Sequence, residues 1–178
     1  MHEQELFAAA LGLQSPWHVS KLNFSEKEKR LDIEIDFEPG SLFSCPVCGK
    51  PAKAYDTNKQ SWRHMDFFQH QAHLHARVPR VECSKGCGVK QIEVPWARSG
   101  SGFTLLFEVL ILTYSKEMPV NKVDKLMAEH DTRLWRVIHH YVDAERALQD
   151  HSGVTQIGMD ETASRRGHNY ISLLVSVR

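Results

Sequence analysis

Apolar and acidic residues alternate without a break from residue 31 to residue 38. The apolar side chains are Leu31, Ile33, Ile35 and Phe37, and the acidic ones are Asp32, Glu34, Asp36 and Glu38. A period of two is typical of a strand with one buried face and one face in water. Residues 17–24 predict a partner strand, and the polar turn 25–29 joins the two into a hairpin. A short helix is predicted over residues 6–13, and Pro16 ends it.

Extended patterns continue as far as residue 98. Residues 60–65, 69–78 and 91–96 each predict a strand. In the middle segment, small apolar side chains alternate with Gln71, His73, His75 and Arg77. This pattern predicts one buried face and one basic or near-basic face that is suited to a phosphate backbone.

The period changes to 3.6 after the Ser- and Gly-rich stretch 98–102, which predicts a flexible connector and a domain boundary. One apolar stripe follows, made of Phe103, Leu106, Phe107, Leu110, Ile111 and Tyr114, with Ser101 or Thr104 as the N-cap. Pro119 is placed to open a second, short helix. Residues 130–132 then break the pattern and begin a third helix. This succession is typical of a helix-turn-helix, and a plain three-helix bundle is the alternative.

In a helix-turn-helix the start of the last helix enters the major groove of DNA. The residues that would face DNA are Thr132, Arg133, Trp135, Arg136, His139 and His140. Arginine suits guanine edges and phosphates alike. Two features favour the plain bundle: Glu129 occupies the turn, where an apolar residue is usual, and the helical segment is slightly acidic.

A period of two returns near the C-terminus. Residues 154–159 predict a buried strand with Asp160 at its end, residues 164–167 predict a turn, and 168–177 predict a second strand. A carboxylate at the end of a buried strand needs a cation or a hydrogen-bond partner, so Asp160 is either a metal ligand or a turn cap. Two strands alone are marginally stable, which predicts that 151–178 begin a domain that is cut short.

The four cysteines form two close pairs, Cys45 with Cys48 and Cys83 with Cys87. Two such pairs supply four sulfur ligands and predict a structural zinc site. A disulfide framework and a redox dithiol in the first pair are the alternatives. Residues 1–13 lack the basic and apolar segments of a signal peptide, and paired cysteines in a reducing cytosol favour a metal. His64 and His70 are expected to have other roles than metal binding.

The net charge of zero, from 22 basic and 22 acidic residues, hides a bias between segments. Residues 45–102 carry nine basic and four acidic side chains, whereas residues 1–44 carry four basic and eight acidic ones. The cysteine-bounded segment is therefore the first place to expect phosphate contacts. No apolar run approaches the ~18–20 residues of a membrane helix, so we expect a soluble, cytoplasmic protein.

Four motifs in order resemble the N-terminal part of insertion-sequence transposases of the ISL-three family. They are the knuckle 45–49, the Trp-Arg-His-Met-Asp stretch 62–66, the helical run 131–138, and the Met-Asp-Glu-Thr and Arg-Arg-Gly-His residues within 159–168. The resemblance implies zinc on the four cysteines and helices over 103–146 that bind terminal inverted repeats. It also implies that Asp160 is the first acidic residue of an RNase H-like core that uses two Mg²⁺ ions. Ser176 and Asp124 depart from the family pattern.

The expected fold is α+β: a β hairpin and zinc ribbon over 1–98, a helix-turn-helix over 99–150, and the first two strands of an RNase H-like domain over 151–178. The expected function is the binding of double-stranded DNA by part of a DDE transposase. The expected location is the bacterial nucleoid in the cytoplasm, and the chain is further expected to form a homodimer on DNA. The family's second aspartate and its glutamate lie beyond this chain, so it is expected to be inactive alone. Arg165 and Arg166 are further expected DNA contacts. A stand-alone DNA-binding regulator or transposition inhibitor, and a zinc-ribbon protein-interaction module, are the alternatives.

Overall fold

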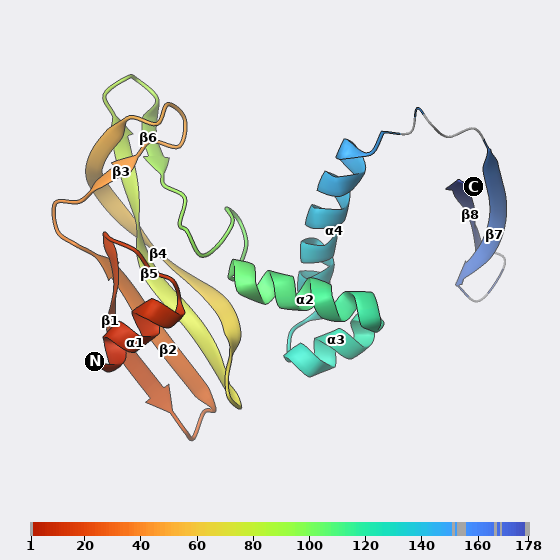
Figure 1. Cartoon of the computed structure of the whole chain (residues 1–178), viewed down its shortest axis with the longest axis horizontal. Coiled ribbons are helices and arrows are strands. Elements are labelled where there is room, and N and C mark those ends of the chain that lie inside the picture. Colours follow the sequence, from red (N-terminus) through yellow and green to blue (C-terminus); the bar gives the residue numbers. More distant parts are fainter. Residues whose placement is uncertain (1, 151, 153–155, 166, 168, 177–178) are drawn as a thin grey trace. The chain divides into compact units, whose positions relative to one another are not determined.

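The alternating segment folds as strand β2 (Arg30–Phe37), with Leu31, Ile33 and Ile35 buried. It pairs antiparallel with β1 (Trp17–Ser25), which confirms the predicted hairpin. In this computed structural model, residues 2–150, 152, 156–165, 167 and 169–176 are described (Figure 1). Contacts divide the chain into two compact units, Met1–Val137 and Ile138–Arg178, and each is treated by itself.

The first unit is built on a six-stranded sheet. Its order is β1-β2-β5-β4-β3, with β6 also paired to β5. The further strands are β3 (Leu42–Ser44), β4 (Pro51–Phe67), β5 (His70–Cys83) and β6 (Gly88–Gln91), and helix α1 (Glu3–Ala10) packs against β1. β2 and β5 run parallel, whereas the remaining pairs are antiparallel (Figure 1).

Strands β4 and β5 are longer than the predicted segments 60–65 and 69–78. The pairing of β4 with β5 shifts register between Ala54 and Asp56 and again between His64 and Phe67. A bulge of this kind moves the following side chains to the opposite face. The period of two is therefore interrupted within one continuous strand, and the sequence pattern identifies only its middle.

Aromatic side chains fill the core on one face of the sheet. Trp17 packs edge-on against Trp96 at a centroid distance of 4.9 Å, and Trp96 packs in the same way against Trp62 at 5.7 Å. Phe37 and Phe43 complete the group at 5.1 Å from each other. Trp62 and Trp96 are both buried.

The opposite face carries ion pairs, which corrects the expectation of a basic face on β5. The Nε2 atom of His75 lies 2.6 Å from Asp32, and Arg77 lies 2.7 Å from Asp36. Parallel pairing of β2 with β5 sets the acidic alternation of one strand beside the basic alternation of the other. The charged side chains of this face therefore pair with one another across neighbouring strands.

Three helices follow the sheet: α2 (Leu105–Glu117), α3 (Val120–Met127) and α4 (Asp131–Leu148). Thr104 is the N-cap of α2 and accepts a hydrogen bond from the Phe107 amide, as one of the two predicted caps. The inward side chains Phe107, Ile111, Val123, Met127, Leu134 and Val137 are buried. None of the helices in the described ranges is long and apolar enough to cross a membrane.

The predicted connector 98–102 is tied to the first unit. Arg98 and the Ser101 hydroxyl both bind the fully buried carboxylate of Glu108, at 2.9 and 2.5 Å. The Arg63 amide of β4 donates to the Gly102 carbonyl, and the Thr104 amide donates to the Arg63 carbonyl. The predicted boundary at residue 98 thus lies inside a unit that continues to Val137.

The second unit contains the end of α4 and the hairpin of β7 (Ile157–Arg165) and β8 (Asn169–Ser176). Both strands were predicted, although Val154, His168 and Val177 at the predicted ends lie outside the described residues. In the described residues β7 pairs with β8 alone. Met159 and Leu174, which face each other across the pair, are 73% and 69% exposed, so the predicted burial of this strand is wrong for the residues described.

Candidate metal centre and nucleic-acid interface

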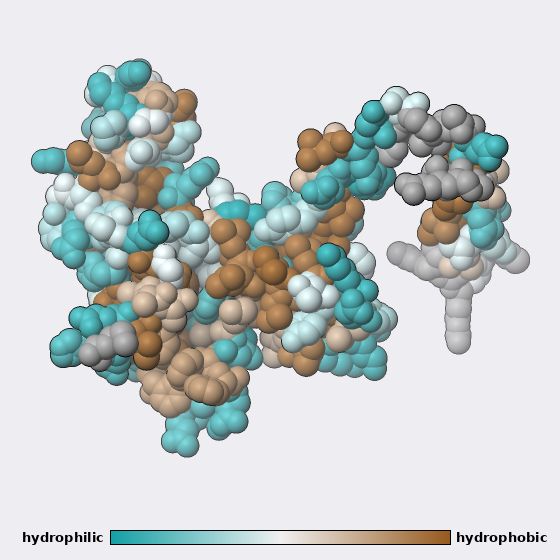
Figure 2. Space-filling model, viewed as in Figure 1, coloured by the Kyte–Doolittle hydropathy of each residue, from teal (hydrophilic) through white to brown (hydrophobic). Residues whose placement is uncertain are grey.

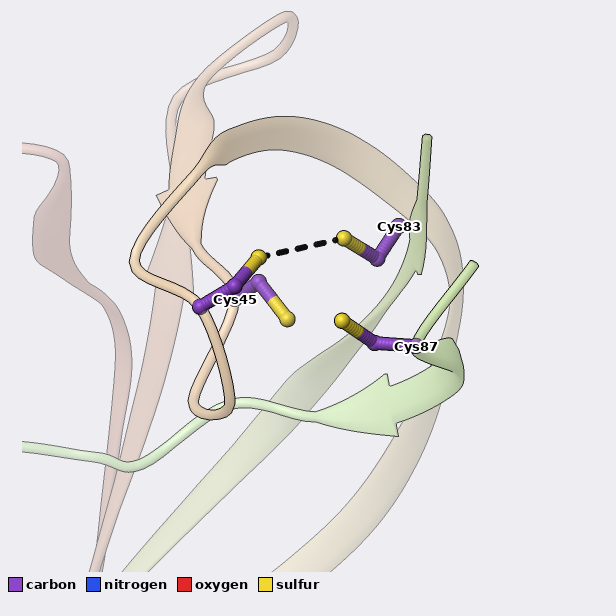
Figure 3. A group of neighbouring side chains, drawn as sticks. Cys45, Cys83 and Cys87 are labelled. Carbon is purple, nitrogen blue, oxygen red and sulfur yellow. Dashed lines mark hydrogen bonds between the residues drawn. The ribbon is translucent and has the colours of Figure 1, made fainter. Parts of the chain in front are cut away.

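The four cysteines meet at one end of the sheet. Their Sγ atoms all lie within 4.8 Å of one another, and those of Cys48 and Cys83 are 3.4 Å apart. Figure 3 shows the sulfur atoms of Cys83 and Cys87 directed toward the loop that carries Cys45, and its dashed line marks the contact between Cys48 and Cys83. Four sulfurs at about 2.3 Å from a tetrahedral zinc ion lie about 3.8 Å apart, so this arrangement fits Zn²⁺.

Each pair lies on a tight turn that its glycine makes possible. The Gly49 amide donates to the Cys45 carbonyl, and Gly49 has a φ of 71°. The Gly86 amide donates to the Cys83 carbonyl, with φ of 79°. An L side chain rarely adopts such a φ, so glycine is the residue that lets both loops fold around sulfur.

The clustered thiols affect one another's protonation. The backbone amide of Lys85 points at Cys83 and lowers the pKa of that thiol to about 6. Hydrogen bonding of the Cys87 thiol with Cys83, and then with Cys48, favours its protonated form and raises the pKa of Cys87 to about 12. A divalent cation would displace the thiol protons and bind the four sulfurs as thiolates, which is the chemistry of a four-cysteine site.

The two predicted non-ligand histidines lie elsewhere. The Nδ1 atom of His64 is 2.8 Å from the Thr104 hydroxyl, and the ring of His70 packs against Phe24 at 4.5 Å. Among the described residues, the cysteines are the one cluster of three or more side chains able to hold a metal.

A tight turn joins α3 to α4. Ala128 ends α3 with a φ of 51°, and its amide and that of Glu129 both donate to the Asp124 carbonyl. Asp124, a departure from the family pattern, is half-buried and leaves Val123 and Met127 buried on either side of it. The helices are therefore packed although Asp124 is not small.

Helix α4 has a buried face and an exposed face. Leu134 and Val137 are buried, whereas the predicted DNA contacts Thr132, Trp135, Arg136, His139 and His140 are exposed. Thr132 and Arg136 are four residues apart and share one side of the helix. Five of the six predicted contacts on this helix are thus accessible.

Arg133, the sixth, is half-buried and lies against neighbouring side chains. Its guanidinium lies 4.2 Å from the ring centre of Phe103 and binds the carboxylate of Glu129. These contacts fix α4 to the segment before α2, so Arg133 holds the helix in place. The helical period alone predicted Arg133 on the exposed side of α4, because a period does not reveal that Glu129 binds the Arg133 guanidinium.

Arg63 of β4 is buried, and the sequence pattern did not predict a functional role for it. Its guanidinium binds Asp66, donates to the Ala72 carbonyl at 3.2 Å and lies 5.0 Å from the ring centre of Phe107. Glu129 lies 3.7 Å from its Nε atom. The unusual acidic residue in the turn, Glu129, is the sequence feature that could have indicated this contact, because a buried carboxylate needs a cation.

Comparison with known families gives two matches along the chain. The zinc-finger of transposases IS204/IS1001/IS1096/IS1165 matches residues 41–87. The helix-turn-helix domain of transposase family ISL3 matches residues 92–142. The matches follow the order of the cysteine site and the three helices, and together they span more than half of the chain. The chain belongs to the ISL3 family of transposases.

Two curated relatives align with nearly the whole ISL3 chain. They are the transposases for insertion sequence element IS1557 from Mycobacterium tuberculosis strains CDC 1551 and H37Rv, each 27% identical over 186 residues. The alignment covers 98% of this chain and 41% of each relative, so the chain spans about two fifths of the length of the curated relatives it matches. No solved structure matches it significantly.

The expected catalytic residue of the ISL3 chain lies within a strand. Asp160 is exposed in the middle of β7, opposite Leu173, and its carboxylate accepts a hydrogen bond from the Glu161 amide at 2.8 Å. The prediction that it ends a strand is wrong, because β7 continues to Arg165. Of the two expected arginine contacts, Arg166 lies outside the described residues, and for Arg165 only the backbone is described.

Proposed function

We propose that this chain is the DNA-binding part of a DDE-type transposase and that it recognises the terminal inverted repeats of an insertion sequence. The observation that carries the proposal is the exposed start of α4, where Thr132, Trp135 and Arg136 project from the helix that follows the turn. In a helix-turn-helix this part of the second helix enters the major groove. The DNA target would place the protein on the nucleoid in the bacterial cytoplasm.

The side chains of α4 have different expected roles. Arg136 has the length and the donors to reach a guanine edge or a phosphate. Thr132, at the start of the helix, is placed for a phosphate contact. His139 and His140 lie one turn further along the same helix, where a backbone contact is the natural role. Arg133 is left out of this set, since Glu129 and Phe103 hold it.

The zinc ribbon supports the DNA-binding helices through β4. This strand runs from Pro51, three residues after Cys48, to Phe67, and its edge at Arg63 receives the segment that leads into α2. A metal at one end of β4 therefore orders the strand that positions the helices. Zinc in this role is structural and takes no part in chemistry.

For catalysis we propose that Asp160 is the first acidic ligand of a two-metal site. Mg²⁺ in such a site activates the attacking oxygen and stabilises the leaving oxygen during phosphodiester cleavage. One aspartate cannot hold two ions. We therefore expect this chain to bind DNA without cutting it.

Selection from a pool of random DNA duplexes tests the proposal. The zinc-loaded chain should enrich one sequence that matches the ends of the element encoding it, and a chelator should abolish the enrichment. Incubation of the selected duplex with the chain and Mg²⁺ should leave both strands intact. Enrichment of no sequence would contradict the DNA-binding proposal, and strand cleavage would contradict the catalytic one.

A further inference from the structure

The turn between β4 and β5 presents an exposed aromatic ring. Phe68 is 86% exposed and has a φ of 55°, a conformation in which glycine or asparagine is usual and a bulky residue is an outlier. Its ring packs edge-on against Phe67 at 4.8 Å. Strained backbone of this kind clusters at functional sites, so the exposed Phe68 is a candidate for a role in binding.

An apolar groove lies beside this ring. It has a cavity volume of about 350 Å³ between α1 and the sheet, and its lining includes Leu6, Phe7, Leu11, Ile33, Met65 and Phe67. Two polar side chains reach it, and both are satisfied: Asp66 binds Arg63, and His64 bonds to Thr104. An engineered cavity of about 150 Å³ already holds benzene, so this groove has room for a phenyl ring.

The ring and the groove belong to one continuous surface. Phe67 lines the groove and packs against both Phe7, at 5.4 Å, and Phe68. Leu6 and Phe24 are 53% and 52% exposed on the same side of the sheet. Figure 2 shows apolar residues gathered over this end of the sheet beside α1.

The lining of the groove favours an apolar partner over nucleic acid. The described residues that line it include no lysine or arginine, and its two polar side chains, Asp66 and His64, already bind Arg63 and Thr104. The first turn of α1 carries the acidic residues Glu3 and Glu5. These lining residues therefore offer no cation to a phosphate backbone, whereas an uncharged aromatic side chain matches the apolar lining.

A surface with both a projecting ring and a groove for one is complementary to itself. A two-fold axis uses each feature twice, because the ring of either copy meets the groove of the other. We propose that Phe68 and the groove under α1 form a homodimer interface, in which the Phe68 of each copy enters the groove of its partner. The exposed aromatic and leucine side chains offer on the order of 400 Å² per copy. This area is below that of stable complexes and predicts a reversible, concentration-dependent dimer.

Analytical ultracentrifugation of the full zinc-loaded chain tests the proposal over roughly a hundredfold range of micromolar concentrations. The wild-type chain should pass from monomer to dimer, and Phe68→Asn should weaken association at least tenfold. Asparagine tolerates a positive φ, so this variant should unfold at the same denaturant concentration as wild type or higher. Tyr55→Asn, which removes another exposed aromatic ring, is the matched control and should dimerise like wild type.

A photoreactive side chain identifies the partner surface. The chain with Phe68→p-benzoylphenylalanine should cross-link, on irradiation, to a peptide containing residues 6–11 of a second copy. A wild-type chain that stays monomeric over the whole range would contradict the proposal. Unchanged association of Phe68→Asn, or a cross-link to DNA or to another part of the chain, would also contradict it.

Discussion

The carboxylate of Glu129 lies 3.7 Å from the Nε atom of Arg63, and both side chains are nearly inaccessible to water. Arg63 belongs to β4 and Glu129 to the turn between α3 and α4, so the pair joins the helix-turn-helix to the ribbon. Arg133 binds the same carboxylate from the first turn of α4. Glu129 therefore contacts the first turn of α4 through Arg133 and attaches this helix to the sheet through Arg63.

Glu129→Ala is expected to lower the free energy of unfolding by about 3 kcal/mol, because it leaves the buried Arg63 without one of its two carboxylates. Urea denaturation of the zinc-loaded chain measures this change. Glu117→Ala, at the exposed end of α2, is the matched control and should change stability by less than about 0.5 kcal/mol. Equal stability of the two variants would show that the Arg63–Glu129 pair contributes nothing.

Zinc removal is expected to unfold the ribbon around β3 and β6. Binding in small zinc modules is worth ~10–16 kcal/mol, so a chelator or Cys48→Ser should abolish the near-ultraviolet signal of the tryptophan core. Metal analysis should find one zinc per chain, and His64→Gln should retain it. The zinc site would be excluded if protein that was never exposed to a chelator contained far less than one equivalent of zinc per chain.

The strands and helices that follow a regular period were predictable from the sequence. Residues 30–37 alternate, and the burial of Leu31, Ile33 and Ile35 follows directly. The four cysteines were predictable as one cluster for a similar reason, since their spacing carries the ligand chemistry. Contacts between distant segments were not predictable: the Arg63–Glu129 pair and the neutralised face of β5 depend on which strands and turns become neighbours.

The exposed face of α4 illustrates the same limit. Its helical period separates Leu134 and Val137 from Thr132 and Arg136, as predicted. It cannot show that Arg133 turns back toward Phe103 and Glu129, because a long side chain reaches partners that spacing along one helix does not reveal.

Acid is expected to destabilise the first unit through His64. Burial, followed by the charge of Arg63, lowers the pKa of His64 from 6.5 to about 4. Between these values the unfolded chain binds a proton that the folded chain excludes, so this contribution is complete above pH 6.5 and is lost as the pH falls toward 4. The stability advantage of wild type over His64→Gln should therefore shrink by up to about 3 kcal/mol between pH 7 and pH 4. Because both proteins carry the same cysteine site, acid release of zinc cancels in the difference, and a pH-independent difference would contradict the assignment.

Arg133 and Arg136 are expected to separate stability from DNA binding. Arg133→Ala should lower the urea midpoint, because it removes the contacts with Phe103 and Glu129. Arg136→Ala should leave the midpoint unchanged, since Arg136 is exposed. Urea denaturation of the two variants side by side checks this contrast, and equal midpoints would contradict it.

The most direct test of the central claim, that α4 binds DNA, is a fluorescence anisotropy titration of the selected duplex at several salt concentrations. Wild type should lose affinity steeply as salt rises, because phosphate contacts release counterions. Arg136→Ala should weaken binding by about 1–3 kcal/mol if it contacts a guanine edge, or lower the salt slope by about one if it contacts a phosphate. Binding by Arg136→Ala with the affinity and the salt slope of wild type would contradict the claim.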